Sequence, residues 1–231
     1  MKIGVVTFPG SNCDYDCYRA ARELLDAETV YLWHRSHDVQ GVDAVFLPGG
    51  FSYGDYLRAG AIASLSPIMK EVRVFADEGG PVVGICNGFQ ILCEAGMLPG
   101  ALIRNRSLKF SSRNVHLRVE QSVAPYTSSY EVGRLLTVPI AHGEGCYVAP
   151  DEVLAELERD GRVIFRYCDA EGSVTPEANP NGSARNIAGI TNAAGNVLGM
   201  MPHPERAVDP LLGTLDGVGL FQSLASYLAA V

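Results

Sequence analysis

Short, continuous apolar runs alternate with helix-like segments through the N-terminal part of the chain, and no other feature constrains the fold as strongly. Apolar residues recur at helical spacing up to about Leu25, from about 61 to 78, and over 88–94. Strands that are apolar throughout and separated by helices are typical of a parallel sheet covered on both faces. We therefore expect an α/β fold with an open, mostly parallel sheet covered by helices on both faces. The expected strands are residues 3–8, 29–33, 42–47 and 82–85.

The second half of the chain has a different pattern. Residues 113–120 alternate, with Val115, Leu117 and Val119 as the apolar positions, which is typical of a strand with one exposed face. The segment NAAGN, 192–196, joins two apolar runs as a hairpin turn would. We therefore expect an antiparallel extension of the sheet in the C-terminal half. The further elements expected there are strands at 135–141, 145–148, 163–168, 186–191 and 197–201, and helices at 151–160 and 218–229.

Length and composition limit the kinds of protein to which the chain can belong. Its 231 residues suit one α/β domain, so we expect a single domain over 1–231. The formal charge of −8 argues against nucleic acid or an anionic membrane as the main partner. No apolar run approaches the roughly 20 residues of a membrane-spanning helix. The N-terminal run is too short for a signal peptide, so we expect a cytoplasmic location and no membrane partner.

The cysteine spacing does not point to a metal site. Cys13 and Cys17 lie one helical turn apart, but no histidine is near them in the sequence. We therefore expect no metal in this chain, no disulfide framework, and an ordinary buried thiol at five of the six positions. The cysteines are at positions 13, 17, 86, 93, 146 and 168, and no two of them form a C-x-x-C pair.

Cys86 lies where a buried strand meets a helix, in the sequence GICNGFQ. The pattern G-x-C-x-G in this context is typical of a nucleophile elbow, with sulfur in place of a hydroxyl. Gly84 and Gly88 would leave room for a sharp turn that exposes the side chain. The N–H groups of the following helix would favour a thiolate, and the N–H of Asn87 could face an oxyanion. Residue types alone leave a buried structural cysteine equally open.

A thiolate nucleophile needs a base, and two histidines compete for that role. In MMPHPER, the prolines favour an extended chain at His203, which would place His203 and Glu205 on the same side. Glu205 would then orient the imidazole toward Cys86. His142 and Glu144 in AHGEG have the same spacing, but Gly143 and Gly145 make that loop less rigid, so a substrate or interface loop is the better interpretation there. Of the two we favour His203 with Glu205, although this segment taken alone leaves open a surface loop with a proline-flanked histidine.

The loop LPGGFSYGDYLRAG, 47–60, follows the third expected strand at its carboxyl end, where open α/β sheets bind ligands. Gly49 and Gly50 allow close approach of the backbone, and a free N–H there could be a second oxyanion donor. A tight turn alone would also explain these glycines. The sequence contains no P-loop, and no strand is followed by G-x-G-x-x-G, so we expect no nucleotide site in this chain.

Three segments taken together resemble a known family: GICNGFQ at 84–90, PGGFSYGD at 48–55 and PHPE at 202–205. Their set and order resemble the class I, triad-type glutamine amidotransferases, whose fold is flavodoxin-like. SYGDYLRAG and AHGEG look more narrowly like the glutaminase subunits of phosphoribosylformylglycinamidine synthase in purine synthesis. The resemblance runs from VVTFPGSNCDYD to the final helix, and the narrower assignment depends mostly on SYGDYLRAG.

The resemblance implies a reaction and a set of partners. Cys86 would attack the side-chain amide of L-glutamine and form a glutamyl thioester, while His203, oriented by Glu205, would move the protons. Backbone N–H groups at Gly50-Phe51 and at Asn87 would hold the oxyanion. The ammonia would pass to a large synthetase subunit, which would bind ATP and magnesium, and a small third subunit would complete the complex. Substrate contacts would come from Gln90 and Gly49.

Ser112 departs from the family pattern, because relatives suggest a cysteine near this position. This departure puts the segment 105–113 in doubt as a glutamine contact and leaves the triad unaffected. Two other interpretations remain open: a stand-alone cysteine hydrolase on the same scaffold, and a non-catalytic regulatory domain. In related cysteine peptidases a histidine commonly follows the elbow cysteine, and here that position is Asn87.

Overall fold

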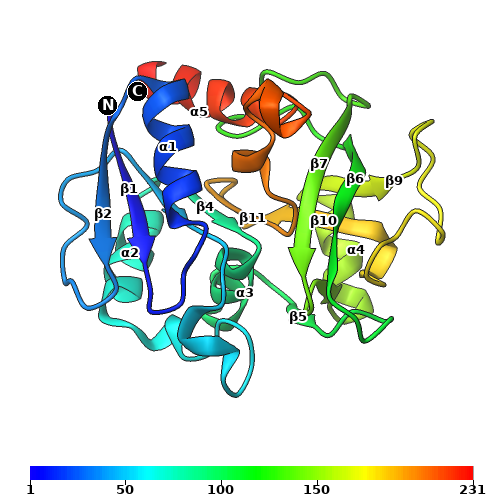
Figure 1. Ribbon diagram of the computed structural model, residues 1–231, viewed down its shortest axis with the longest axis horizontal. Helices are drawn as coiled ribbons and strands as arrows, with labels where there is room; N and C mark the ends of the chain where they lie inside the picture. Colours follow the sequence, from blue (N-terminus) through cyan, green and yellow to red (C-terminus); the bar gives the residue numbers. More distant parts are fainter. Residues whose placement is uncertain (231) are drawn as a thin grey trace.

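The computed structural model describes residues 1–230, and within this range nine strands form one sheet. Five neighbouring strands are parallel to one another, as the continuous apolar runs predict (Figure 1). Val82 of the fourth strand lies opposite Val197 of the eleventh, so a late segment of the chain completes this half. In spatial order the parallel strands are β2 (Glu28–Trp33), β1 (Lys2–Thr7), β3 (Ala44–Leu47), β4 (Val82–Ile85) and β11 (Val197–Met200).

The sheet continues from β11 as an antiparallel half, which confirms the expected extension. Its strands in spatial order are β10 (Ile187–Thr191), β9 (Val163–Cys168), β6 (Ser111–Val119) and β7 (Leu135–His142). A separate two-stranded ribbon pairs β5 (Ala101–Ile103) with β8 (Cys146–Val148). β5 is not predictable from the sequence, because a strand of three residues has too little periodicity to detect.

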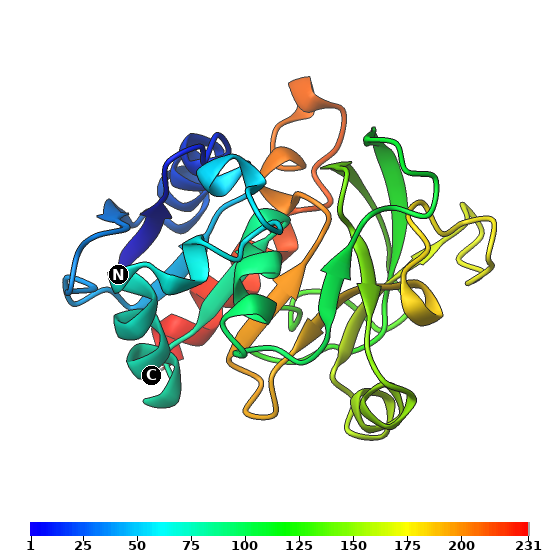
Figure 2. The ribbon, with the colours of Figure 1, turned by 90° about the horizontal axis from the view of Figure 1, so that it is seen from below.

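Helices cover both faces of the parallel half, as expected. Consecutive residues of a strand point to opposite faces. In β3, Phe46 stacks on Phe221 of the C-terminal helix, whereas Leu47 lies beside Gly88 of the helix that follows Cys86. Those two helices therefore cover opposite faces, and Figure 2 shows α2 and α3 in front of the sheet and α5 behind it. The helices are α1 (Asp14–Leu25), α2 (Pro67–Asp77), α3 (Asn87–Glu94), α4 (Asp151–Arg159) and α5 (Val218–Ala230).

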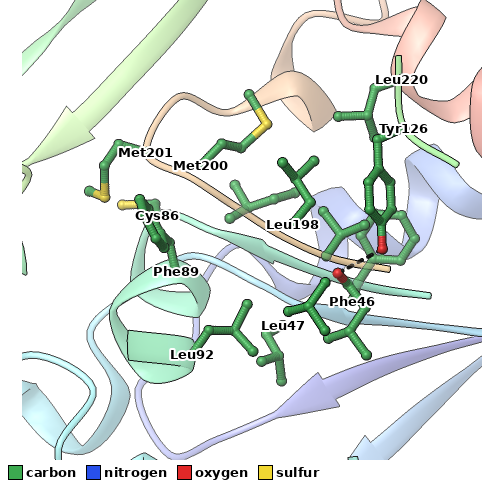
Figure 3. Packing of buried hydrophobic residues seen from close by; sticks show 14 of the residues in the cluster. Phe46, Leu47, Cys86, Phe89, Leu92, Tyr126, Leu198, Met200, Met201 and Leu220 are labelled. Carbon is green, nitrogen blue, oxygen red and sulfur yellow. Dashed lines mark hydrogen bonds between the residues drawn. The ribbon is translucent and has the colours of Figure 1, made fainter. Parts of the chain in front are cut away.

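A continuous apolar core packs around β3, β4 and β11 (Figure 3). Tyr126 is fully buried at one end of the packing drawn there, and its hydroxyl donates to the carbonyl of Val82, 3.0 Å away. Cys86 lies at the other end, just beyond the carboxyl end of β4. Because β3, β4 and β11 are parallel, the segments that follow all three leave the sheet at the same edge. Among residues 1–230, no helix combines the length and apolar character that crossing a bilayer requires.

Candidate active site

Cys86 occupies a strained turn between β4 and α3. Its backbone has φ 51° and ψ −104°, a left-handed conformation that residues other than glycine rarely adopt and that costs on the order of 1–3 kcal/mol. Neighbouring glycines make the turn possible. A Cβ on Gly84 would lie 2.5 Å from Cδ1 of Leu92, and a Cβ on Gly88 would overlap the carbonyl oxygen of Leu47. This is the geometry that the G-x-C-x-G pattern predicts.

His203 and Glu205 form a buried, hydrogen-bonded pair. The distance from Nδ1 of His203 to Oε1 of Glu205 is 2.7 Å, and both side chains are almost completely buried. The backbone N–H of His203 donates to the carbonyl of Pro139 at 2.9 Å, which fixes the imidazole against β7. The chain is not extended through Glu205 as the sequence analysis expects, because Pro204–Arg206 form a 3-10 turn. The turn nevertheless brings the carboxylate to the ring.

The environment of His203 favours its charged form. Burial by itself lowers the pKa of an imidazole, but the negative charge of Glu205 and the sulfur of Cys86 outweigh burial. The pKa of His203 is therefore raised well above its usual value. An imidazole with a raised pKa is a strong base that can also return its proton, which suits a group that must do both in one reaction.

Gly49 packs closely against the side chains of His203 and Cys86. A Cβ built on Gly49 would lie 2.7 Å from Cε1 of His203 and 3.4 Å from Cβ of Cys86. The end of β3 is thus held tightly against both side chains. Gly49 does not line the cavity described below, so the structure gives it a packing role beneath the site rather than a place on the cavity wall.

A cavity of about 270 Å³ opens above Cys86. This volume is close to the lower end for small-molecule sites and suits a ligand of amino-acid size. Its wall carries charges of both signs: Asp55 and Glu144 are acidic, and Arg104 and Lys109 are basic. The full set of lining residues is Gly50, Phe51, Asp55, Cys86, Gln90, Arg104, Leu108, Lys109, Phe110, Ala141, His142, Gly143 and Glu144.

Gln90 and Asn87 tie three parts of the cavity together. The side-chain amide of Gln90 donates to the carbonyl of Glu144 at 2.6 Å and accepts from the amide of Asn87 at 2.8 Å. The oxygen of the Asn87 amide accepts from the N–H of Ser52 at 3.2 Å, and its nitrogen faces Asp55 at 3.5 Å. From the sequence, only the backbone N–H of Asn87 was expected to contribute to the site. The structure adds that its side chain joins α3 to the loop after β3.

Gly50 and Phe51, the two oxyanion-hole candidates in the loop after β3, differ in their surroundings. Gly50 has φ 136° and forms an isolated bridge with Ser11, and a Cβ there would lie 2.7 Å from the backbone nitrogen of Asn12. Phe51 lines the cavity, but its N–H donates to the carbonyl of Gly10 at 3.0 Å. The Phe51 donor is therefore engaged in this structure.

His142, the competing base, is held by amide side chains. Its Nδ1 lies 3.1 Å from Oδ1 of Asn105, and its Nε2 lies 3.5 Å from the amide nitrogen of Asn181. Burial, followed by the nearby charge of His203, lowers the pKa of His142 to about 4, so the ring is neutral. Since both ring nitrogens face amides, His142 supports the cavity wall and does not pair with Glu144.

Several residues at the site were not singled out from the sequence. Asp55 was quoted only as part of the loop, and Arg104 was not considered. Lys109 belongs to the segment 105–113, which the departure at Ser112 had put in doubt as a glutamine contact; the structure places Leu108, Lys109 and Phe110 of that segment on the cavity wall. Cys13 was expected to be an ordinary buried thiol, but its sulfur would lie 3.1 Å from a Cβ on Gly49. A cysteine in the turn directly after the first strand was the available signal, because that turn opens at the same edge of the sheet.

Comparison with known proteins places this chain in a family. Residues 1–215 match the model of the CobB/CobQ-like glutamine amidotransferase domain. A phosphoribosylformylglycinamidine synthase subunit PurQ from Gloeobacter violaceus is 58% identical over 232 residues, covering 100% of both chains. The chain belongs to the PurQ family of glutamine amidotransferase domains.

A second PurQ sequence and a solved structure support the same family assignment. The PurQ subunit of Salinibacter ruber is 54% identical over 230 residues, covering 100% of this chain and 98% of that protein. A chain in the structure of PurLQS from Thermotoga maritima superposes with a TM-score of 0.87 at 44% identity, covering 98% of each chain. The flavodoxin-like fold expected from the resemblance is confirmed, and PurQ membership favours an amidotransferase over a stand-alone cysteine hydrolase or a regulatory domain.

Proposed function

We propose that this chain is the glutaminase subunit of a phosphoribosylformylglycinamidine synthase, and that Cys86, His203 and Glu205 hydrolyse L-glutamine within one domain spanning 1–231. Val231 lies outside the residues that the structure describes. One observation carries this proposal: the elbow cysteine opens into an amino-acid-sized cavity whose wall holds both a basic pair and an acidic pair. That wall complements the carboxylate and the ammonium group of a free amino acid.

In the proposed mechanism, Cys86 Sγ attacks the side-chain amide carbon of glutamine and gives a tetrahedral oxyanion. His203 donates a proton to the leaving nitrogen, the C–N bond breaks, and ammonia departs from the glutamyl thioester. His203 then takes a proton from water, the resulting hydroxide attacks the thioester, and glutamate leaves as the proton returns to the sulfur. Glu205 holds Nδ1 of His203 throughout, so Nε2 is the nitrogen that moves the protons.

Backbone donors near the elbow would stabilise the oxyanion. We assign the N–H of Asn87 and the N–H of Gly50 to this role, since Asn87 begins α3 and Gly50 lines the cavity beside Cys86. The N–H of Phe51 could contribute only after giving up the carbonyl of Gly10. Gln90, fixed between Asn87 and Glu144, would contact the bound glutamine, and Gly49 would act indirectly by holding His203 in place.

The partner subunits follow from the same proposal. The Thermotoga maritima relative is part of PurLQS, and ammonia formed at Cys86 would pass to a large ATP-dependent synthetase subunit, with a small third subunit completing the assembly. ATP and magnesium would bind to the large subunit, because this chain has no phosphate-binding loop. We place this complex in the cytoplasm, where the acidic chain without a spanning helix would work.

An electrophilic analogue of glutamine tests the proposal directly. A diazoketone that mimics glutamine should alkylate this chain once, and mass spectrometry of a digest should find the adduct on Cys86. Excess L-glutamine should slow the labelling, whereas excess L-glutamate, which lacks the amide, should slow it less. An adduct on one of the other five cysteines, or labelling that glutamine does not slow, would contradict the proposal.

Asp55 is expected to make glutamine binding depend on pH. Burial, and secondly the charge of Glu144, raise the pKa of Asp55 to about 6, so its carboxylate is charged above that pH and neutral below it. If the carboxylate binds the ammonium group of glutamine, KM should rise as the pH falls through 6. Asp55→Asn should raise KM by about 10- to 100-fold at higher pH and remove this dependence, because a charge-assisted hydrogen bond contributes about 1.5–3 kcal/mol. Measuring KM of the complex on both sides of that pH decides the matter. A KM for the unsubstituted protein that does not change with pH would count against the assignment.

Glu205→Gln is expected to lower kcat by about 10²–10⁴ with little change in KM. The amide keeps the size of the carboxylate but removes the charge that raises the pKa of His203 above the effect of burial. With that charge gone, the imidazole becomes a weaker base. Steady-state kinetics of the assembled complex measure the effect. An increase in KM at unchanged kcat would instead assign Glu205 to substrate binding.

A further inference from the structure

A second thiol lies against the histidine–glutamate pair. The sulfur of Cys13, a ring nitrogen of His203 and a carboxylate oxygen of Glu205 all lie within 4.8 Å of one another. Cys13 directly precedes α1, and its backbone N–H reaches the carbonyl of Gly49 at 3.4 Å. The fold therefore brings three ligand types from distant parts of the chain into one buried cluster, which we call the Cys13 cluster.

The polar atoms of this cluster are only partly satisfied. Among residues 1–230, Oε2 of Glu205 is buried and has no hydrogen-bond partner. Nε2 of His203 also has none, but that nitrogen is the one assigned above to proton transfer and is not a ligand in this cluster. The sulfur of Cys13 accepts from a guanidinium N–H of Arg206 at 3.2 Å, and Arg206 also donates to Asp16 at 2.9 Å. Buried polar atoms without partners are uncommon in proteins and mark places where a proton, water or ion can bind.

Thiolate, imidazole and carboxylate together are the ligands that zinc prefers. We propose that the Cys13 cluster binds Zn²⁺ through Cys13 Sγ, His203 Nδ1 and a carboxylate oxygen of Glu205, with a water molecule in the fourth position. The ion would replace the proton shared by His203 and Glu205.

The dimensions of the cluster allow this exchange. With Zn–S of about 2.3 Å and Zn–N and Zn–O of about 2.0 Å, tetrahedral ligands lie about 3.3–3.5 Å apart. The nitrogen and the carboxylate oxygen, now 2.7 Å apart, need to separate slightly, and Cys13 needs to approach them. Arg206 contacts the sulfur, and Arg206 and its partner Asp16 are both partly exposed, so a displacement of the Arg206 side chain would open a path for the ion.

The exchange conserves charge within the buried cluster. Binding of one Zn²⁺ releases two protons to solvent, one from between His203 and Glu205 and one from the thiol of Cys13. The net charge of the cluster is then unchanged, so the nearby guanidinium of Arg206 meets no additional positive charge. The affinity should increase with pH, because both protons must leave.

Zinc in the Cys13 cluster would separate His203 from its orienting carboxylate and stop proton transfer. This consequence depends on the proposed function, whereas metal binding itself does not. The two can therefore be tested separately: metal binding by spectroscopy on the full chain, and its consequence by glutamine hydrolysis in the complex.

X-ray absorption at the zinc edge provides the first test, with the variant Cys86→Ala. This variant removes the nucleophile, which is the alternative sulfur ligand for zinc. We expect one bound zinc per chain, with one sulfur at about 2.3 Å and the remaining ligands nitrogen or oxygen. No bound zinc, or a site without sulfur, would overturn the proposal and would assign any zinc bound by the unsubstituted protein to Cys86. This measurement does not require a Cys13 variant to fold.

Inhibition provides the second test. Zinc should inhibit glutamine hydrolysis by the complex, and a chelator should restore it. In Cys13→Ser the zinc concentration for half-inhibition should rise about tenfold or more, because one of three protein ligands is weakened. Cys168→Ser, which removes a buried thiol on β9 away from the site, should respond like the unsubstituted protein. Equal sensitivity of the two variants would contradict the proposal. Loss of hydrolysis in all variants without metal would instead contradict the proposed function.

Discussion

Replacing Cys86 by alanine is expected to abolish glutamine hydrolysis by the assembled complex, lowering kcat by about 10³-fold or more. Alanine keeps the Cβ that packs near Gly49 but removes the sulfur that forms the thioester. The synthetase reaction should continue when ammonia is supplied in place of glutamine, because only the source of ammonia is lost. Parallel assays with glutamine and with ammonium salt measure both effects.

Cys93→Ala is the matched control for this experiment. Cys93 lies on the same helix, two turns after the elbow, and is buried beside the carbonyl of Pro99. Burial raises the pKa of the Cys93 thiol far above its usual value, so this sulfur is not a nucleophile. We expect Cys93→Ala to lower stability slightly and to leave kcat close to that of the unsubstituted protein. Full glutamine-dependent activity in Cys86→Ala would refute the proposed mechanism.

Gly88→Ala is expected to destabilise the fold by about 3 kcal/mol or more. An added Cβ would overlap the carbonyl oxygen of Leu47, which belongs to the central strand β3 and cannot move aside alone. Either β3 or the first turn of α3 must shift, and both position the site. Urea unfolding of the full chain measures the loss as a lower transition midpoint.

Gly195→Ala separates this clash from the general cost of replacing a glycine. Gly195 has φ 78° in the hairpin turn before β11, and an added Cβ there would have no neighbour within 4 Å. Its replacement should cost only about 1 kcal/mol, through backbone strain. A similar loss of stability in both variants would show that α3 relaxes away from β3 at little cost.

Periodicity predicted most of the fold because its strands have strong local patterns. Val82–Ile85 and Val163–Cys168 were predicted with their observed bounds, since each is a mainly apolar run closed by turn residues. The 3-10 turn after His203 was not predicted, because Pro204 constrains its own φ and leaves the conformation of the following residues open. In that turn, tertiary contacts rather than local preference determine the path of the chain.

The candidate site likewise has features that the sequence predicts and features that only the folded protein shows. Cys86 and its two glycines form a local pattern, so the elbow could be read from the sequence alone. The charges of the cavity wall could not, because Asp55, Arg104 and Glu144 come from three separate segments that meet only in the folded protein. The engaged N–H of Phe51 depends on the distant carbonyl of Gly10. The neutral ring of His142 depends on burial in the folded protein and on the charge of His203, which is also distant in the sequence.

The pairing of β4 with β11 also determines when the protein can become active during its synthesis. Cys86 follows β4, whereas His203 and Glu205 follow β11, and the two strands join in the register that places Val82 opposite Val197. A ribosome-bound chain can make the elbow early, but it has no base until the last part of the sequence emerges. Closing such a long loop is also a slow step in folding. Under the proposed mechanism, an unfinished or C-terminally truncated chain therefore carries the nucleophile without its base, and would not release ammonia before the partner subunits have a complete subunit to bind.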